Sequence, residues 1–324
     1  MKKILIITYS QDNESIEMVT NAIRQKGGEV IRFNTDLYPT DVELTTQYIN
    51  GQQQLFYRDE HNTLYNLSEV TAVWYRRARY GEKLKEQLDE KFLAPSIEET
   101  RRTFRGFLAS LDCFVLDNIP TIRYAEIKEL QLKIAEKVGL QIPKTLFTNS
   151  PKAVKDLYHQ CPNGLITKMQ ASFAIYEDGI ENVVFTNEIS EADLEKMDSL
   201  RYCPMTFQEK ITKKVELRVT VVGNQVFCAS IDSQASEKSQ MDWRKDGEGL
   251  LASWKNYDLP LIVKEKLLQL MAHFQLTYGA IDVIVTPDEE YVFLEVNPAG
   301  EFFWLEMLPP NFPISEAIAD VLLG

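Results

Sequence analysis

The start of the chain alternates between apolar runs and amphipathic segments in the manner of a parallel sheet. Residues 3 to 8 form a β-like run, KILIIT, and residues 14 to 26 carry apolar side chains at helical spacing. Two glycines then precede a second β-run, EVIRF, at 29 to 33. This order predicts a βαβ unit and hence a parallel sheet. Because no GxGxxG follows the first strand, the motif for a dinucleotide site is missing.

The pattern continues with a hairpin-like stretch at 54 to 67, a β-run at 72 to 75 and a long helical region to about 112. The run at 72 to 75 is followed at once by Arg76, Arg77 and Arg79. Guanidinium groups at a strand end are suited to binding an anionic substrate through charged hydrogen bonds. A solvated basic turn that pairs with the acidic helix EQLDEKFLAPSIEET is the alternative. A last strand at 114 to 120 predicts a first domain of residues 1–120.

The rest of the chain is rich in strands. A helix is predicted from 127 to 138, where Gly139 ends it, and an exposed helix is predicted from 189 to 200. Strands are predicted at 141 to 148, 164 to 170, 182 to 186, 205 to 211, 280 to 286 and 291 to 297, with a hairpin at 215 to 232. We therefore expect two further α+β subdomains, residues 121–210 and 211–324.

Composition and charge exclude several classes of function. With 324 residues, of which 44% are hydrophobic, the chain predicts a multidomain globular protein, and no apolar run is long enough for a membrane span. The net charge of −13 argues against a nucleic-acid partner. The four cysteines are isolated and the start lacks a signal-peptide pattern, which predicts a cytoplasmic protein without disulfides. The three histidines lie near no nucleophile motif, which disfavours a catalytic triad.

Oxygen-bearing side chains interrupt the last two predicted strands. In YVFLEVNPAG, at 291 to 300, Glu295 and Asn297 are two residues apart and so share a face of the strand. A hairpin with the strand at 280 to 286 would bring Asp282 opposite them. Three oxygen donors fit Mg²⁺ that shares its shell with phosphates. The alternative is that these residues are the hydrogen-bonded ends of an ordinary hairpin.

Together with residues upstream, this trio resembles the ATP-grasp superfamily. The order is a Lys on a helix, a Lys on a strand, a Gln-Glu pair, a Glu-x-Arg hairpin, and then the Asp and Glu-x-Asn sites. The resemblance covers about 120 to 310 and implies an α/β (α+β ATP-grasp) fold, with an N-terminal βαβ pre-ATP-grasp domain and two subdomains that clasp ATP. It implies ATP contacts by Lys128, Lys168, Gln208, Glu209, Ile211 and Glu216, catalytic roles for Arg218 and Lys168, and magnesium ligation by Asp282, Glu295 and Asn297.

Within the superfamily, three segments look like the microviridin-type peptide ligases, which are similar to the ribosomal-protein glutamate ligases. The segments are VWYRRARYG, RYCPMTFQEKI and FLEVNPAGEFFWLE. The resemblance implies a ligase that phosphorylates Asp or Glu side chains of a ribosomal precursor peptide and joins them to Ser or Thr hydroxyls as ω-esters. Lactam formation with Lys and intermolecular carboxylate–amine ligation are the alternatives. A third alternative is a regulatory protein that binds nucleotide without turnover. The presence of both proposed metal carboxylates argues against it, because a protein that only binds nucleotide does not need both. A homodimer is expected.

Two surface segments complete these expectations. Arg244, in SQMDWRKDGEG, is expected to reach the acyl phosphate from a loop whose glycines allow closure. The acids Glu191, Asp193 and Glu195 lie on the predicted helix 189 to 200, with Ser190 as its N-cap. These acids either stabilise their own helix or bind a basic residue on the helical leader of the precursor.

Overall fold

The computed structural model describes residues 1–170, 174–177, 180–183, 186–232 and 252–324. Arg244 and its glycine-containing loop lie outside the described residues, as do parts of the segment between Lys168 and the helix that begins at Glu191. The chain forms two compact units. Unit 1 comprises Met1–Ile122, Glu301–Phe303 and Pro313–Gly324, and unit 2 comprises Arg123–Gly300 and Trp304–Phe312.

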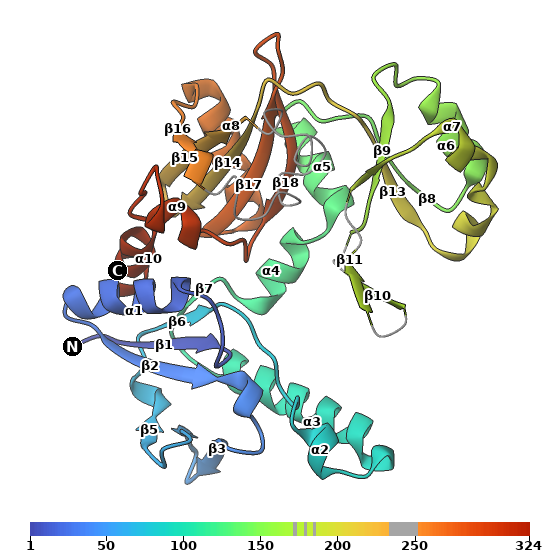
Figure 1. The fold of residues 1–324 in the computed structure, drawn as a ribbon. Helices are drawn as coiled ribbons and strands as arrows, with labels where there is room; N and C mark the ends of the chain where they lie inside the picture. The colour runs from blue at the N-terminus through green and yellow to red at the C-terminus, as the bar shows by residue number, and fades with distance from the viewer. Residues whose placement is uncertain (171–173, 178–179, 184–185, 233–251) are drawn as a thin grey trace. The chain divides into compact units, whose positions relative to one another are not determined.

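Unit 1 is built on a parallel sheet with strand order β2-β1-β6-β7 (Figure 1). Its elements are β1 (Lys3–Thr8), α1 (Ser15–Gln25), β2 (Glu29–Asn34), β3 (Glu43–Ile49), β4 (Gln52–Arg58), β5 (Leu64–Asn66), β6 (Ala72–Tyr75), α2 (Leu84–Gln87), α3 (Glu90–Ala109), β7 (Phe114–Leu116) and α10 (Ile314–Leu323). The predicted βαβ unit is confirmed, since β1 and β2 pair in parallel across α1.

Both faces of this sheet are covered. Leu5 and Ile7 on one face of β1 join Phe104 and Phe107 of α3 in one buried core. Ile4, the neighbour of Leu5, is equally buried and points to the other face. The last helix, α10, packs beside α1 from the opposite end of the chain (Figure 1). The C-terminal segment thus completes the N-terminal unit.

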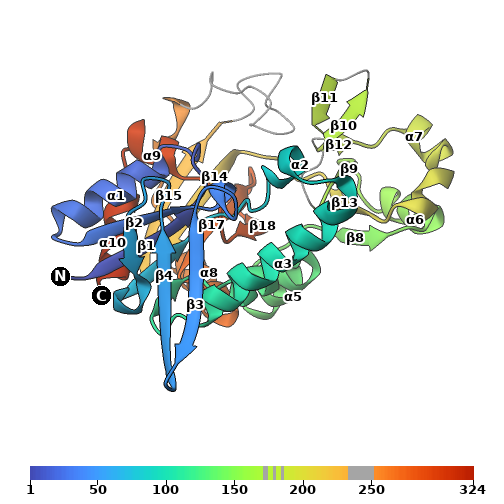
Figure 2. The ribbon, with the colours of Figure 1, turned by 90° about the horizontal axis from the view of Figure 1, so that it is seen from below.

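A second, antiparallel sheet of unit 1 has the order β3-β4-β5, and its first two strands form a long hairpin (Figure 2). Leu55 and Tyr57 of β4 turn inward to the same core as Phe33. Tyr48 and Ile49, at the hairpin tip, are exposed.

Unit 2 contains two larger antiparallel sheets, ordered β12-β9-β13-β8 and β16-β15-β14-β17-β18, and the separate hairpin β10-β11. Its elements are α5 (Lys128–Lys137), β8 (Thr145–Thr148), α6 (Pro151–Tyr158), β9 (Leu165–Lys168), β10 (Ala174–Glu177), β11 (Ile180–Val183), β12 (Asn187–Glu188), α7 (Glu191–Glu195), β13 (Met205–Glu209), β14 (Val215–Val222), β15 (Gln225–Ile231), β16 (Lys255–Asn256), α8 (Leu261–Phe274), β17 (Tyr278–Val285) and β18 (Tyr291–Asn297). α4 (Ile119–Ala125) and α9 (Phe303–Met307) contain points where the chain passes between the units.

One face of the five-stranded sheet carries the main core of unit 2. Its buried side chains come from alternating positions of β14, β17 and β18 and from the helices α5 and α8. Ile281 and Val283, for example, point to this face, so Asp282 between them points away from it. The polar residues that interrupt the strands thus lie on the face opposite the core.

The predicted helix at 189 to 200 differs in length from the observed one. α7 ends at Glu195, and a 3-10 helix runs from Met197 to Tyr202. Ser190 is the N-cap, as predicted, and forms a capping box with Asp193. Ile189, Leu194 and Leu200 are buried in one core, and the partly buried Met197 packs against it. Tightening to 3-10 geometry keeps Leu200 against this core after the α-helix has ended.

The sequence prediction also left out α8, a 14-residue helix in the segment described as strand-rich. The predicted cut at about 210 within unit 2 stays a prediction. In the described chain, no helix is long and apolar enough to cross a membrane.

Candidate functional site

The last two strands of the five-stranded sheet bring the predicted oxygen donors together. β17 and β18 pair antiparallel through the turn at 286 to 290, and Asp282 lies directly opposite Glu295. Asn297 pairs with Ala280, one step further along the same face. The predicted hairpin is therefore confirmed, and the three side chains start from adjacent positions on one face of the sheet.

A β-bulge makes this arrangement compatible with the core. The pairing passes from Asp282–Glu295 to Val283–Phe293, so that Leu294 is skipped. In a regular strand without the bulge, Phe293 and Glu295 would share a face. With it, Phe293 is fully buried in the main core while Glu295 stays partly exposed on the other face.

Each of the two carboxylates is held by its own cation. Arg218 of β14 lies opposite Asp282 in the sheet, and its Nη1 is 2.7 Å from Asp282 Oδ1. The Lys128 Nζ, at the start of α5, is 2.6 Å from Glu295 Oε2. The guanidinium of Arg218 is mostly buried and also lies over the Trp304 ring, 5.5 Å from its centroid. A buried guanidinium needs a counter-charge, and Asp282 supplies it.

The charges continue along β14. Glu216 lies two residues before Arg218 on the same face, and its Oε1 accepts a hydrogen bond from Lys213 Nζ at 2.8 Å. Five charged side chains, Lys128, Glu216, Arg218, Asp282 and Glu295, thus belong to this one surface of α5 and the sheet. The cationic side chains of this surface can bind phosphate groups, and the carboxylates can bind a divalent cation carried by those phosphates.

The donor set fits Mg²⁺. Two carboxylates and one amide oxygen on one face are hard oxygen ligands, the type that Mg²⁺ prefers. They are fewer than an octahedral shell requires, which leaves positions for phosphate oxygens or water. The side-chain oxygen of Asn297 also accepts a hydrogen bond from the Ala299 amide at 3.0 Å, which orients it in a tight turn.

The predicted adenine and phosphate residues lie in the other sheet of unit 2. Lys168 of β9 pairs with Thr206 of β13, so that Lys168 and Gln208 share a face of this sheet. Gln208 is buried and donates to Thr145 Oγ1 at 2.9 Å, whereas Glu209 is bound through backbone and side chain to Lys144. Ile211 follows the end of β13 and is partly exposed. Their roles toward ATP stay predictions.

The arginines after β6 form a separate cluster in unit 1. Arg76 is buried, and its Nη2 lies 2.7 Å from Glu301 Oε2. Arg77 pairs with Glu301 and lies 3.5 Å from Asp12. The Arg79 guanidinium stacks 3.9 Å from the centroid of the Tyr9 ring. The arginines after β6 therefore have acidic partners, Glu301 and Asp12, that the sequence had not indicated. Burial, together with the neighbouring charge of Arg76, lowers the pKa of Arg77.

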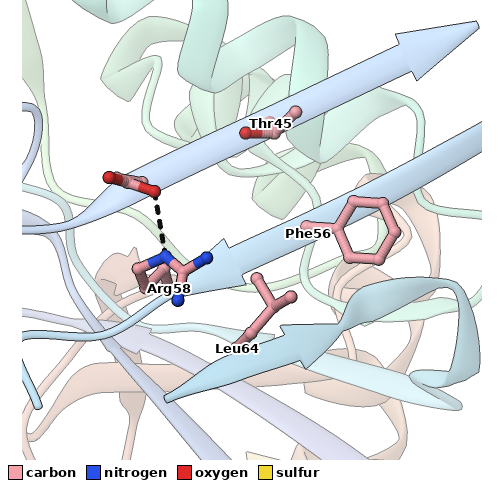
Figure 3. Close-up of a pocket in the computed structure, with 5 residues that line it drawn as sticks. Thr45, Phe56, Arg58 and Leu64 are labelled. Carbon is pink, nitrogen blue, oxygen red and sulfur yellow. Dashed lines mark hydrogen bonds and ion pairs between the residues drawn. The ribbon is translucent and has the colours of Figure 1, made fainter. Parts of the chain in front are cut away.

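A pocket on unit 1 is unrelated to these groups. It has a volume of about 210 Å³, lies on the sheet β3-β4-β5, and is lined by Glu43, Thr45, Phe56, Arg58 and Leu64 (Figure 3). Arg58 Nε donates to Glu43 Oε2 at 3.0 Å, so the charged lining groups already satisfy each other. This surface offers few converging polar groups of the kind that binding sites use.

Sequence reasoning missed a polar side chain in the core beside the site. Gln131 of α5 is fully buried, and its amide bonds the backbone of Val296, between Glu295 and Asn297. The sequence feature that could have revealed it is a glutamine that lies among the apolar positions of an amphipathic helix, next to Leu132. A polar side chain buried at such a position needs hydrogen-bond partners.

Comparisons with known proteins show the family of this chain. Residues 3–123 match the model of the MvdD pre-ATP grasp domain. A RiPP-associated ATP-grasp ligase from Chryseobacterium gregarium, solved with ADP and a leader and core peptide, is 47% identical with a TM-score of 0.96, over 100% of this chain and 97% of that chain. Macrocyclase MdnC from Microcystis aeruginosa MRC, bound with precursor peptide MdnA, is 46% identical with a TM-score of 0.89, over 99% of each chain. Macrocyclase MdnB from the same strain is 36% identical with a TM-score of 0.83, over 100% of this chain and 99% of that chain. A search of curated proteins gives no significant match.

The fold shared with these ligases defines an ATP-grasp enzyme. At this similarity over whole chains, the protein belongs to the RiPP-associated ATP-grasp ligases, the enzymes of ribosomally made, modified peptides. The predicted family and fold class are therefore confirmed.

Proposed function

We propose that the protein is an ATP-dependent, Mg²⁺-requiring macrocyclase that joins Asp or Glu side chains of a ribosomal precursor peptide to Ser or Thr hydroxyls as ω-esters. The observation that carries the proposal is the pairing of Asp282 with Glu295, each bound to a cation, in a chain 46% identical to MdnC. The ADP and the leader and core peptide in the C. gregarium complex support both the nucleotide and the peptide substrate.

The first chemical step is phosphoryl transfer to a carboxylate. An oxygen of the peptide carboxylate attacks the γ-phosphorus, the bond to the β-γ bridging oxygen breaks, and ADP leaves with that electron pair. The step needs charge neutralisation more than covalent help from protein. In this proposal Arg218 and Lys168 contact the transferred phosphoryl group and Lys128 contacts the nucleotide phosphates, while Gln208, Glu209, Ile211 and Glu216 bind adenine and ribose.

Asp282, Glu295 and Asn297 would hold the metal. Bound Mg²⁺ would supply Lewis-acid neutralisation of the phosphate oxygens. Before nucleotide arrives, Arg218 and Lys128 balance the two carboxylates, which keeps these side chains oriented. When a phosphate group and a cation enter together, both lysine and arginine can exchange a carboxylate partner for a phosphate partner at little net electrostatic cost.

The second step is ring closure. The hydroxyl oxygen of a Ser or Thr side chain attacks the acyl carbon, phosphate leaves with the electron pair of the broken C–O bond, and the hydroxyl proton passes to solvent or phosphate. The result is a lactone. We propose that Arg244 contacts the acyl phosphate. The same acyl phosphate would give a lactam with a Lys amine, which is the alternative.

We propose that α7 binds the leader of the precursor. Glu191, Asp193 and Glu195 are exposed, and all three lie on this short helix. Asp193 is already used locally: its carboxylate accepts hydrogen bonds from the Ser190 amide at 2.9 Å and hydroxyl at 2.6 Å, which lowers the pKa of Asp193. Glu191 and Glu195 are therefore the main contacts for a basic leader residue, and Asp193 chiefly fixes the helix that presents them.

We further propose that Arg76, Arg77 and Arg79 contact acidic residues of the peptide, that the enzyme is a homodimer, and that it acts in the cytoplasm, where ATP and newly made peptide meet. Glu301 shows that the turn after β6 already accepts a carboxylate.

Mass spectrometry of a precursor peptide incubated with enzyme, ATP and Mg²⁺ tests the function. Loss of one water per ring, reversed by mild alkaline hydrolysis, is expected for ω-esters. Water loss that resists alkaline hydrolysis would indicate lactams, and addition of a free amine compound to the peptide would indicate intermolecular ligation.

A further inference from the structure

At Val296, the position between two proposed metal ligands, the outer edge of β18 is bound by the side chain of Gln131. β18 is the last strand of its sheet in the described part of the chain, and on its far side Gln141 bridges to Val292 and accepts a hydrogen bond from the Phe293 amide at 2.8 Å. Further along this edge, the backbone groups of Val296 meet the side chain of Gln131. The Val296 amide donates to Gln131 Oε1 at 3.0 Å, and Gln131 Nε2 donates to the Val296 carbonyl at 2.8 Å.

This pair of hydrogen bonds resembles the backbone pairing that a neighbouring strand would form with Val296. Gln131 supplies one donor and one acceptor to the same residue, the pattern by which paired strands bind. Its second amide hydrogen is directed to the Ala125 carbonyl, in the last turn of α4, at 2.6 Å. Because Gln131 is fully buried and both hydrogens and the oxygen are bonded, its amide has a single fitting orientation.

The same helix reaches the site a second time. Lys128 stands three residues before Gln131 on α5, nearly one turn away, and pairs with Glu295. α5 thus binds one residue by its side-chain charge and the next by its backbone. The position of Glu295 along β18 is fixed relative to Lys128 by two contacts from one rigid helix.

The turn that follows is also held. The Tyr278 hydroxyl donates to the Gly300 carbonyl at 2.7 Å, and both groups are buried. Gly300 packs so closely on Ala280 that an added Cβ would lie 2.4 Å from the alanine Cβ. The segment from Val296 to Gly300 is therefore anchored at both ends, with Asn297 between the anchors.

From these contacts we infer that Gln131 is a positioning residue for the metal site, one that sets the register of Glu295 and Asn297 against Asp282. The inference rests on the proposed metal role of these three residues. An apolar replacement would remove both Gln131 hydrogen bonds from Val296, so that this end of β18 would lose its anchor to α5.

Gln131→Met tests the inference, because methionine keeps the length of the side chain and removes all three hydrogen bonds. ADP affinity is measured by calorimetry on the full chain with Mg²⁺ and with EDTA. We expect affinity with Mg²⁺ to fall about tenfold, because Glu295 and Asn297 would no longer be held in place for the metal, with affinity in EDTA unchanged. Hydrogen exchange of the backbone amides at 291 to 297 should accelerate in the same variant.

Leu270→Ala is the matched control. Leu270 is fully buried in the same core but lies on α8, so its truncation destabilises unit 2 without removing a hydrogen bond from β18. We expect this variant to keep the wild-type ratio of ADP affinities with and without Mg²⁺. If Gln131→Met lowers the thermal midpoint as Leu270→Ala does but keeps that ratio, Gln131 is structural only and the inference is overturned.

Two further outcomes are separable. If Gln131→Met does not fold, Gln131→Glu is measured in the same way; it keeps the acceptor for the Val296 amide, and an unchanged ratio in this variant overturns the inference. If wild-type protein binds ADP equally with Mg²⁺ and with EDTA, the metal assignment of the proposed function fails, and the inference fails with it.

Discussion

Asp282 and Glu295 lie directly opposite each other on β17 and β18, yet each carboxylate is bound by a cation from a different element, Arg218 of β14 and Lys128 of α5. Two like charges at facing positions of a sheet repel each other. The two cations offset this repulsion, so that the two side chains can lie side by side. The sheet therefore presents two carboxylates side by side, as the proposed metal site requires.

Neutralising either carboxylate should stop ATP turnover. We expect Asp282→Asn and Glu295→Gln each to lower ADP release by at least about two orders of magnitude, because each removes a charged ligand and leaves a cation without its partner. Coupled-enzyme detection of ADP measures the effect, and circular dichroism checks the fold. Asp288→Asn, the same change at an exposed residue in the connecting turn, is the control. Near-normal ADP release by either site variant would contradict the metal assignment.

The nucleotide products report the route of activation. Because the acyl-phosphate route breaks the β-γ bond, we expect ADP and phosphate in a one-to-one ratio, measured by anion-exchange chromatography of the reaction. AMP with pyrophosphate would instead reveal an adenylated carboxylate and refute the proposed first step.

Lys168 should act on nucleotide and not on peptide. Lys168→Ala is expected to weaken ATP binding by about 10- to 150-fold, since a hydrogen bond to a charged group contributes ~1.5 to 3 kcal/mol. Calorimetry with a non-hydrolysable ATP analogue and, separately, with precursor peptide measures both affinities. Lys152→Ala, at an exposed lysine on α6, should leave both unchanged. An equal loss of both affinities would make Lys168 a structural residue.

The acids of α7 should differ in their effects. Glu191→Ala is expected to weaken leader binding several-fold without changing the thermal midpoint, since its carboxylate is exposed and outside the capping box. Asp193→Ala should lower the midpoint as well, because it opens the box with Ser190. Fluorescence anisotropy of a labelled leader peptide measures affinity, with Asp198→Ala in the following 3-10 helix as control. Wild-type leader affinity in both variants would exclude α7 as the docking site.

Cysteine reactivity gives a test of the fold itself. Burial raises the pKa of the Cys228 thiol to about 12, and burial also raises the pKa of Cys161. At pH 8 only about one Cys228 thiol in ten thousand would be ionised, so iodoacetamide should modify the exposed Cys203 first in native protein. Peptide mapping of briefly alkylated protein checks the order, and Cys203→Ser should abolish the fast phase. Rapid labelling of Cys228 would show that the core around β15 is not packed as described.

The sequence by itself determined the periodic elements and the order of the chemical groups. The βαβ opening, the hairpin at β14 and β15, and the final hairpin follow from local alternation of apolar and polar positions, which depends only on near neighbours along the chain. The same alternation showed that Glu295 and Asn297 share a face, and the order of lysines, arginine and acids identified the family.

Only the tertiary structure decided which residues meet around these chemical groups. Strict alternation would put Phe293 on the same face as Glu295, and a bulge at Leu294 separates them because the core requires the phenylalanine. The partners Lys128 for Glu295 and Gln131 for Val296 come from α5, about 160 residues earlier in the chain. Likewise α10 completes unit 1 from the far end of the sequence. Such contacts depend on which buried surfaces meet in the folded chain, and no local pattern records that choice.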